Sequence, residues 1–238
     1  MLKYFGYNYQ GEDFSLFSFS HIIMLIIAVI SVVVPYYLRN IKSVNYIKFF
    51  ILFGLIGSEF TLNLWYLLNG VWDVAYTLPL QLCSISLYLS IFMLITEKYA
   101  LFEITFFLGV GGALQALLTP ELFYDFPHFR YFHFFIAHIS IVLASVYMVF
   151  VVKYKPTLTS VWKAILALNL IAIIVFFINA GTGGNYMFLS RKPANPSLID
   201  YLGSYPWYLL SLELIALIMF LVLYVIFLVH GCMERTKK

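Results

Sequence analysis

The chain has 238 residues, of which 63% are hydrophobic, 20% aromatic and only 11% charged, and its mean hydropathy is +0.93. This composition excludes an ordinary soluble domain and is typical of a polytopic membrane protein. The net charge of +3 is small, and the basic residues form no patch of the kind that binds nucleic acid, so we expect no nucleic-acid partner.

Seven apolar stretches are long enough to cross a membrane, because a spanning helix needs about 20 mostly apolar residues. These stretches are 15–38, 46–69, 78–97, 99–119, 131–153, 159–180 and 205–230. Ten of the fourteen Lys and Arg residues follow or flank the inner ends of these stretches if the N-terminus lies outside. Since basic residues favour the cytoplasmic side, the sequence predicts an all-α, seven-helix membrane domain over residues 1–238 with an outside N-terminus and a cytoplasmic C-terminus.

The first two spans carry polar side chains at membrane depth. His21 lies about two turns below the predicted outer surface, at 1.5 Å per residue. Glu59 and Asn63 are four residues apart in the second span and therefore share one helix face. A carboxyl group at that depth is expected to face protein rather than lipid.

The third span begins with a polar run that contains Gln81 and Cys83. These two residues are separated by about 200° around a regular helix, so they face one site only if the turn after Pro79 is irregular. A lone cysteine in such a helix is usually a small packing residue. Cys232 lies at the opposite end of the membrane, so we expect both cysteines to be free thiols.

The remaining spans each add a polar residue near the predicted outer side. The fourth span carries Gln115, and its glycines indicate close helix packing. In the fifth span His138 lies about two turns deep, whereas His133 is nearer the interface and about 140° away around the helix. Asn179 ends the sixth span, and Glu213 lies about two turns into the seventh.

Most of these polar residues fall in the predicted outer half of the membrane. The simplest arrangement is a polar cavity that opens to the outer leaflet and includes His21, Glu59, Asn63, Gln81, Cys83, Gln115, His138, Asn179 and Glu213. No Lys or Arg lies at the depth of either glutamate. We therefore expect each carboxyl group to be protonated or paired with a histidine such as His21 or His138.

A cysteine and a histidine at similar depth indicate acyl-transfer chemistry. A basic imidazole close to Cys83 would generate a thiolate that attacks an ester carbonyl. We assign His138 as this base, because it lies at the depth of Cys83 on a helix that runs in the same direction. The side-chain amides of Gln81, Gln115 or Asn179 could then stabilise the oxyanion.

The longest polar connection joins the last two spans. It contains Asn185, Arg191 and Lys192 beside a glycine-rich turn. These residues are candidates for holding a lipid headgroup phosphate at the interface. A simple interfacial anchor is the alternative.

Three motifs carry a resemblance to a known family: GTGGNYMFLSRKPANPSLIDYLGSYPWY, LPLQLCS and FHFFIAH. Through them the chain resembles, over essentially its whole length, the YwaF-type integral membrane proteins of bacteria, which are similar to the eukaryotic transmembrane protein 164. That relative is described as a cysteine-dependent acyltransferase acting on phospholipids, and it is compared with the androgen-induced membrane hydrolases. The resemblance implies Cys83 as the acyl-accepting nucleophile, His138 as its base, and a location in the cytoplasmic (plasma) membrane of a bacterium.

We therefore expect a lipid acyltransferase or acyl hydrolase that acts on a membrane phospholipid or lysolipid and uses no cofactor and no metal. The acyl acceptor and the oligomeric state stay open. One alternative is a solute-binding or transport protein with an outer-facing polar cavity, against which the lack of an internal repeat weighs. A second is a metal-dependent membrane hydrolase with His21, His138 and a glutamate, Glu59 or Glu213, as ligands.

Overall fold

The fold is all-helical over the residues that our computed structural model describes, which are 4–39, 44–193 and 198–235. Two short 3₁₀ helices, η2 (Tyr186–Phe188) and η3 (Leu198–Leu202), lie between the last two α-helices. The seven α-helices are α1 (Phe19–Leu38), α2 (Val44–Leu68), α3 (Leu82–Thr96), α4 (Tyr99–Leu118), α5 (Phe129–Phe150), α6 (Leu158–Thr182) and α7 (Trp207–Arg235). Each of them overlaps one predicted span, and the all-α prediction is confirmed for the described residues.

Six of these helices are long and apolar enough to cross a membrane, and α3 is the exception. With 15 residues, α3 is about 22 Å long, which is shorter than a hydrocarbon core of about 30 Å. Pro79 explains the shortening, because proline lacks an amide donor and restricts the preceding residue to an extended conformation. The predicted third span, 78–97, is therefore corrected to a non-helical segment followed by a short helix; the segment contains a tight turn in which the Leu80 N–H donates to Leu78 O at 2.7 Å.

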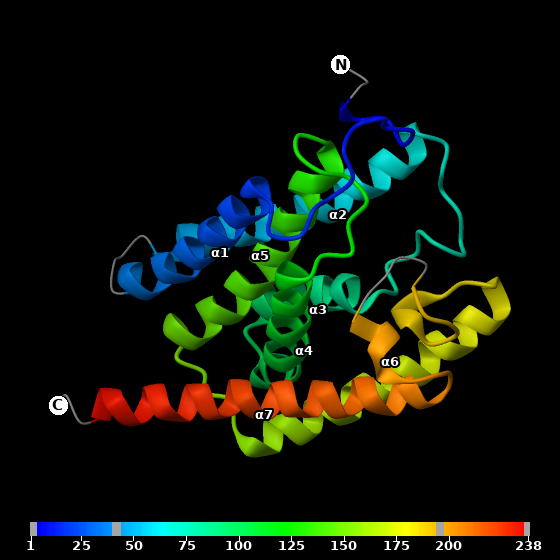
Figure 1. Cartoon of the computed structure of the whole chain (residues 1–238). Coiled ribbons are helices and arrows are strands. Elements are labelled where there is room, and N and C mark those ends of the chain that lie inside the picture. The colour runs from blue at the N-terminus through cyan, green and yellow to red at the C-terminus, as the bar shows by residue number, and fades with distance from the viewer. Residues whose placement is uncertain (1–3, 40–43, 194–197, 236–238) are drawn as a thin grey trace.

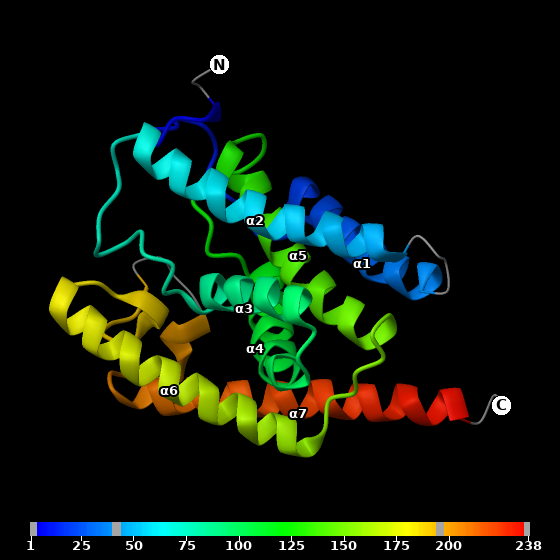
Figure 2. The ribbon, with the colours of Figure 1, turned by 180° about the vertical axis from the view of Figure 1, so that it is seen from behind.

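Helices α4 and α5 form the centre of the bundle. In their spans 61% and 72% of the residues are buried, whereas the other four spanning helices reach at most 22%. Figures 1 and 2 show α1 and α2 on one side of this centre and α6 and α7 on the other, with α3 beside α4. The outer helices therefore present broad apolar surfaces to their surroundings.

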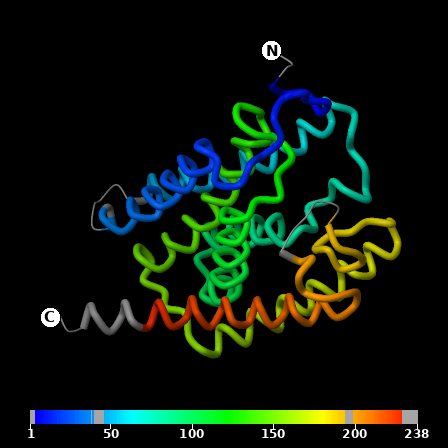
Figure 3. Tube along the Cα trace, in the orientation of Figure 1, coloured from blue at the N-terminus to red at the C-terminus, as the bar shows by residue number. Residues whose placement is uncertain are grey.

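The connecting segments gather into two groups. One group consists of residues 4–18, 69–81, 119–128 and 183–193, and Figure 3 shows the first of these running past the end of α2. The hydrogen bonds that join this group include Trp65 Nε1 to Phe5 O (2.6 Å), Tyr124 OH to Tyr7 O (3.0 Å) and Tyr186 OH to Val74 O (2.7 Å). All four segments were expected on the outer side, so their grouping agrees with the predicted alternation of the spans.

The second group contains the α3–α4 turn and the α5–α6 connection. The Glu97 carboxylate accepts a hydrogen bond from Lys48 Nζ at 2.5 Å. The main-chain oxygen of Glu97 accepts one from the Tyr154 hydroxyl at 2.6 Å. Tyr99 donates to the main-chain oxygen of Lys155 at 2.7 Å. The positively charged residues near this end support a cytoplasmic position. Which end of the bundle faces the cytoplasm stays a prediction.

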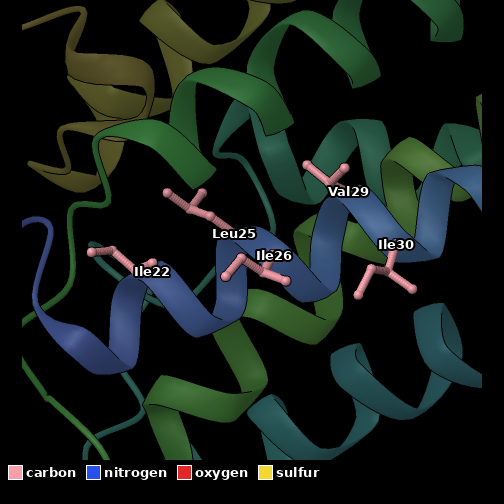
Figure 4. A pocket seen from close by; sticks show the side chains of 5 residues that line it. All are labelled: Ile22, Leu25, Ile26, Val29 and Ile30. Atoms are coloured by element: carbon pink, nitrogen blue, oxygen red, sulfur yellow. The ribbon is translucent and has the colours of Figure 1, made fainter.

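The best-formed hollows on the surface are apolar. A shallow groove of about 270 Å³ follows α1 and is lined by Ile22, Leu25, Ile26, Val29 and Ile30, as Figure 4 shows. A similar groove of about 290 Å³ follows α7. Such surfaces suit contact with lipid acyl chains.

Candidate functional site

The segment before α3 places Gln81 outside the helix. Its backbone is extended (φ −67°, ψ 148°), and α3 begins at the next residue. The Gln81 side chain turns toward the loop after α6, where its Oε1 accepts a hydrogen bond from the main-chain N–H of Met187 at 2.9 Å. The turn after Pro79 is therefore irregular, which is the condition named above for Gln81 and Cys83 to face one site, and the amide oxygen of Gln81 is bound to the loop.

Cys83 lies in the first turn of α3 and is a partly buried free thiol. Ser86 and Ser90 follow at positions i+3 and i+7 and so lie on the same face of the helix. Both serines are almost completely buried, with exposed fractions of 1% and 0%. Cys83 therefore lies on the face of α3 that packs into the protein. The side chain of Cys232 lies outside the described residues.

His138 is buried in the centre of α5. Its Nδ1 lies 2.7 Å from the main-chain oxygen of Phe134. A carbonyl oxygen only accepts hydrogen bonds, so Nδ1 carries the proton and, in the neutral ring, Nε2 carries the lone pair. This Nε2 is buried and has no hydrogen-bond partner. The ring therefore holds an unused acceptor inside the bundle.

Contacts along α4 relate the depths of Cys83 and His138. Leu82, next to Cys83, packs 3.7 Å from the position that a Cβ on Gly112 would occupy, and Gly109 packs in the same way against Ile141 at 3.1 Å. Because α4 and α5 run in opposite directions, Gly112 and Leu82 are level with about His138, and Cys83 is level with about the first residue after it. The two therefore differ in depth by about 1.5 Å. No hydrogen bond joins them, since His138 Nε2 has no partner.

Glu59 binds to amide and phenol groups. Its Oε1 accepts from Asn63 Nδ2 on the same helix and from the Tyr88 hydroxyl on α3, both at 3.0 Å. This arrangement joins α2 to α3. Of the two alternatives expected for Glu59, a protonated carboxyl group or pairing with a histidine, the second is excluded. The shared helix face of Glu59 and Asn63 is confirmed.

Glu213 likewise has an amide partner. Its Oε1 accepts from Asn169 Nδ2 at 2.6 Å, and Asn169 also donates to the main-chain oxygen of Ile165. The bond joins α6 to α7, away from α3 and α5. Glu213 is therefore not paired with His21 or His138, because the rotation of α7 directs its carboxyl group toward α6.

Both ring nitrogens of His21 form hydrogen bonds with main-chain groups. Its Nδ1 accepts from the N–H of Phe17 at 3.0 Å, and its Nε2 donates to the main-chain oxygen of Leu117 at 2.8 Å. The ring is completely buried. His21 therefore fixes the start of α1 to the end of α4 and has no free nitrogen for a ligand.

Asn179 and Asn185 organise the loop after α6. Asn179 donates to the main-chain oxygen of Tyr186 and accepts from its N–H, both at 2.9 Å. Asn185 forms the same pair of bonds with the main chain of Arg191. Lys192 Nζ donates to the main-chain oxygen of Asp200 at 3.1 Å, and Arg191 is exposed. Both asparagine side chains are thus used by the loop itself.

Gln115 lies on an exposed part of α4 and donates to Thr119 Oγ1 at 2.6 Å. The expected single cavity of nine polar residues is therefore corrected. Over the described part of the chain, all of these side chains except Cys83 form separate local bonds, with His138 bonded through Nδ1 only, because each helix satisfies its polar groups with the nearest amide, hydroxyl or main-chain partner.

Arg130 and His133 form a pair that we did not predict from the sequence. Arg130 donates to His133 Nδ1 at 3.0 Å, and His133 Nε2 donates to the main-chain oxygen of Ser58 at 3.1 Å. The guanidinium also lies over the rings of Trp65 and Tyr66, at 5.7 and 5.9 Å from their centroids. The spacing of three residues on one helix is the signal that could have indicated this pair.

No group of three His, Cys, Asp or Glu side chains within the described ranges is arranged to hold a metal ion. His21, Glu59 and Glu213 each bind elsewhere. The metal ligands suggested for a metal-dependent hydrolase, His21, His138 and one glutamate, therefore do not lie together.

Comparison with known proteins identifies a family. The sequence model described as the TMEM164 family matches residues 16–224. No curated protein and no solved structure matches the chain. The predicted relationship to transmembrane protein 164 is confirmed, and the narrower bacterial assignment stays a prediction.

Proposed function

The chain belongs to the TMEM164 family, and we propose that it is a membrane-embedded enzyme that moves acyl chains of phospholipids through a Cys–His site. Cys83 is the nucleophile and His138 the base. The observation that carries the proposal is the unpaired Nε2 of His138, a buried lone pair at nearly the depth of the only cysteine in the outer half of the predicted topology.

The position of Cys83 in α3 supports its role as nucleophile. It is the second residue of a helix whose N-cap, Gln81, makes no side-chain capping bond. The first N–H groups of a helix have no partner within the helix, and the helix dipole adds positive potential there. These groups could bind the oxyanion of a tetrahedral intermediate.

The reaction consists of two transfers. First, His138 Nε2 takes the thiol proton and the Cys83 sulfur attacks an acyl ester carbonyl; the ester C–O bond breaks, and the proton passes to the departing lysolipid oxygen. Second, the acceptor hydroxyl gives its proton to Nε2 and its oxygen bonds to the acyl carbon, while the C–S electron pair returns to sulfur, which recovers the proton. The site needs only a nucleophile and a base.

Arg130 supports a phospholipid as the substrate. Its guanidinium has no carboxylate within 4.0 Å among the described residues. Eight residues separate it from His138, about 12 Å along α5, and the phosphate of a phospholipid lies on the water side of its acyl esters. Guanidinium groups bind phosphate well. We therefore assign the headgroup phosphate to Arg130 in preference to Asn185, Arg191 and Lys192.

The test is acyl transfer by purified protein in phospholipid nanodiscs, with a labelled phospholipid donor and a lysophospholipid acceptor. Wild type is expected to transfer the label. Cys83→Ala should lose transfer, and His138→Gln should slow it roughly 10²–10⁴-fold. Ser84→Ala, which changes a neighbouring residue on another face of α3, is the matched control. Transfer that persists in Cys83→Ala would reject the proposal.

A further inference from the structure

Four buried hydroxyl groups beside the candidate site have no hydrogen-bond partner in the described part of the chain. They belong to Ser86 and Ser90 on α3, Thr105 on α4 and Ser145 on α5. Their exposed fractions are 1%, 0%, 0% and 0%. These four groups, called the hydroxyl column below, come from three helices that pack on one another.

The register of the helices places these groups at neighbouring depths. Ser90 and Thr105 are equally far along the chain from the Glu97–Lys98 turn that joins α3 to α4, so they are level with each other. Ser86 is similarly level with Gly109. A Cβ on Gly109 would lie 4.0 Å from Ser145 Oγ and 3.7 Å from Thr105 Cγ2. The hydroxyl column therefore begins one turn below Cys83 and extends about one further turn inward.

Unpaired hydroxyls in a helix core need an explanation. A serine or threonine in a helix can donate to the carbonyl four residues earlier, and Ser58 and Thr96 do so here. The four hydroxyls of the column do not, although burying an unpaired hydroxyl is unfavourable. Several such groups at neighbouring depths are the setting in which buried water is found, because each water needs two to four polar partners.

We propose that the hydroxyl column binds water, and that the water at its outer end is an acyl acceptor. Ser86 is the outermost hydroxyl, and His138, whose Nε2 is a further unpaired buried atom, lies about one helical turn further out by the same register. This second part rests on the proposed function. The water gives a proton to His138 Nε2 and its oxygen bonds to the thioester carbon. The C–S bond then breaks, the fatty acid leaves, and the Cys83 thiolate recovers the proton from His138.

The binding of water is tested by whether the Tm of a Thr105 variant falls or rises. This measurement does not depend on enzyme activity. Thr105→Val replaces the hydroxyl by a methyl group of similar size. If water binds Thr105, the variant leaves that water short of a partner and Tm falls by about 2–4 °C. If the column is dry, valine removes an unpaired group and Tm stays the same or rises, which would overturn the proposal. Thr96→Val, whose hydroxyl bonds to its own helix, is the control.

The acceptor role is tested in H₂¹⁸O with phospholipid donor and lysophospholipid acceptor both present. Wild type should release fatty acid that carries ¹⁸O. Ser86→Ala should lower the ratio of released acid to transferred acyl chain roughly tenfold, and an unchanged ratio would overturn the assignment. If no acyl chain reaches Cys83, the proposed function fails, whereas the Tm comparison still decides whether the column holds water.

Discussion

Asn179 is predicted to contribute to stability by holding the loop after α6. It is 2% exposed and forms two hydrogen bonds of 2.9 Å with the main chain of Tyr186, which is itself 1% exposed. Asn179→Ala leaves the buried N–H and C=O of Tyr186 without partners. Each unsatisfied group costs about 1–3 kcal/mol, so we expect a loss of about 2–6 kcal/mol in the free energy of unfolding.

Thermal unfolding in nanodiscs measures this loss, and hydrogen–deuterium exchange reports on the loop directly. A loss of that size corresponds to a Tm lower by more than about 4 °C, with faster exchange at the Tyr186 amide. Asn179→Asp keeps the acceptor but places a buried carboxylate oxygen against the Tyr186 carbonyl oxygen, so it should also destabilise the protein. A loss below about 1 kcal/mol with unchanged exchange at Tyr186 would refute the reasoning.

Three further predictions concern charged and titratable groups. Burial lowers the pKa of His128, so the folded state binds fewer protons than the unfolded state. The stability should therefore fall as the pH drops below about 6.5. His128→Asn should flatten a curve of Tm against pH, and a curve as steep as that of wild type would contradict this. Arg130→Gln should raise the KM for phospholipid roughly tenfold or more with a smaller change in kcat, and an unchanged KM would argue against phosphate binding there. Glu213→Gln keeps an acceptor for Asn169 and should transfer acyl chains within about twofold of wild type, whereas loss of transfer would give Glu213 a role in the site.

Hydropathy alone located the helices well, because every main-chain polar group in lipid must be bonded within its own helix. The error at α3 arose at Pro79, since apolar residues continue through a segment that is not helical. The 200° separation of Gln81 from Cys83 made an irregular turn the condition for a shared site, and the structure contains such a turn. Length and periodicity therefore predicted the elements, and local chemistry determined where one of them begins.

The partners of the polar side chains could not be predicted in the same way. Depth placed Glu213 near the histidines, but the rotation of α7 brings it to Asn169 instead. Such rotations depend on packing between helices that are far apart in sequence. The buried hydroxyls of Thr105 and Ser145 were missed for a related reason: hydroxyl side chains are common in membrane helices, so their importance emerges only when they lack a partner.

The most direct test of the central claim is the intact mass of the purified protein after incubation with phospholipid of a single acyl composition. We predict a mass increase equal to one acyl group, located on Cys83 by peptide mapping, absent in Cys83→Ala and strongly reduced in His138→Gln. An unmodified Cys83 under conditions in which acyl transfer proceeds would contradict the account.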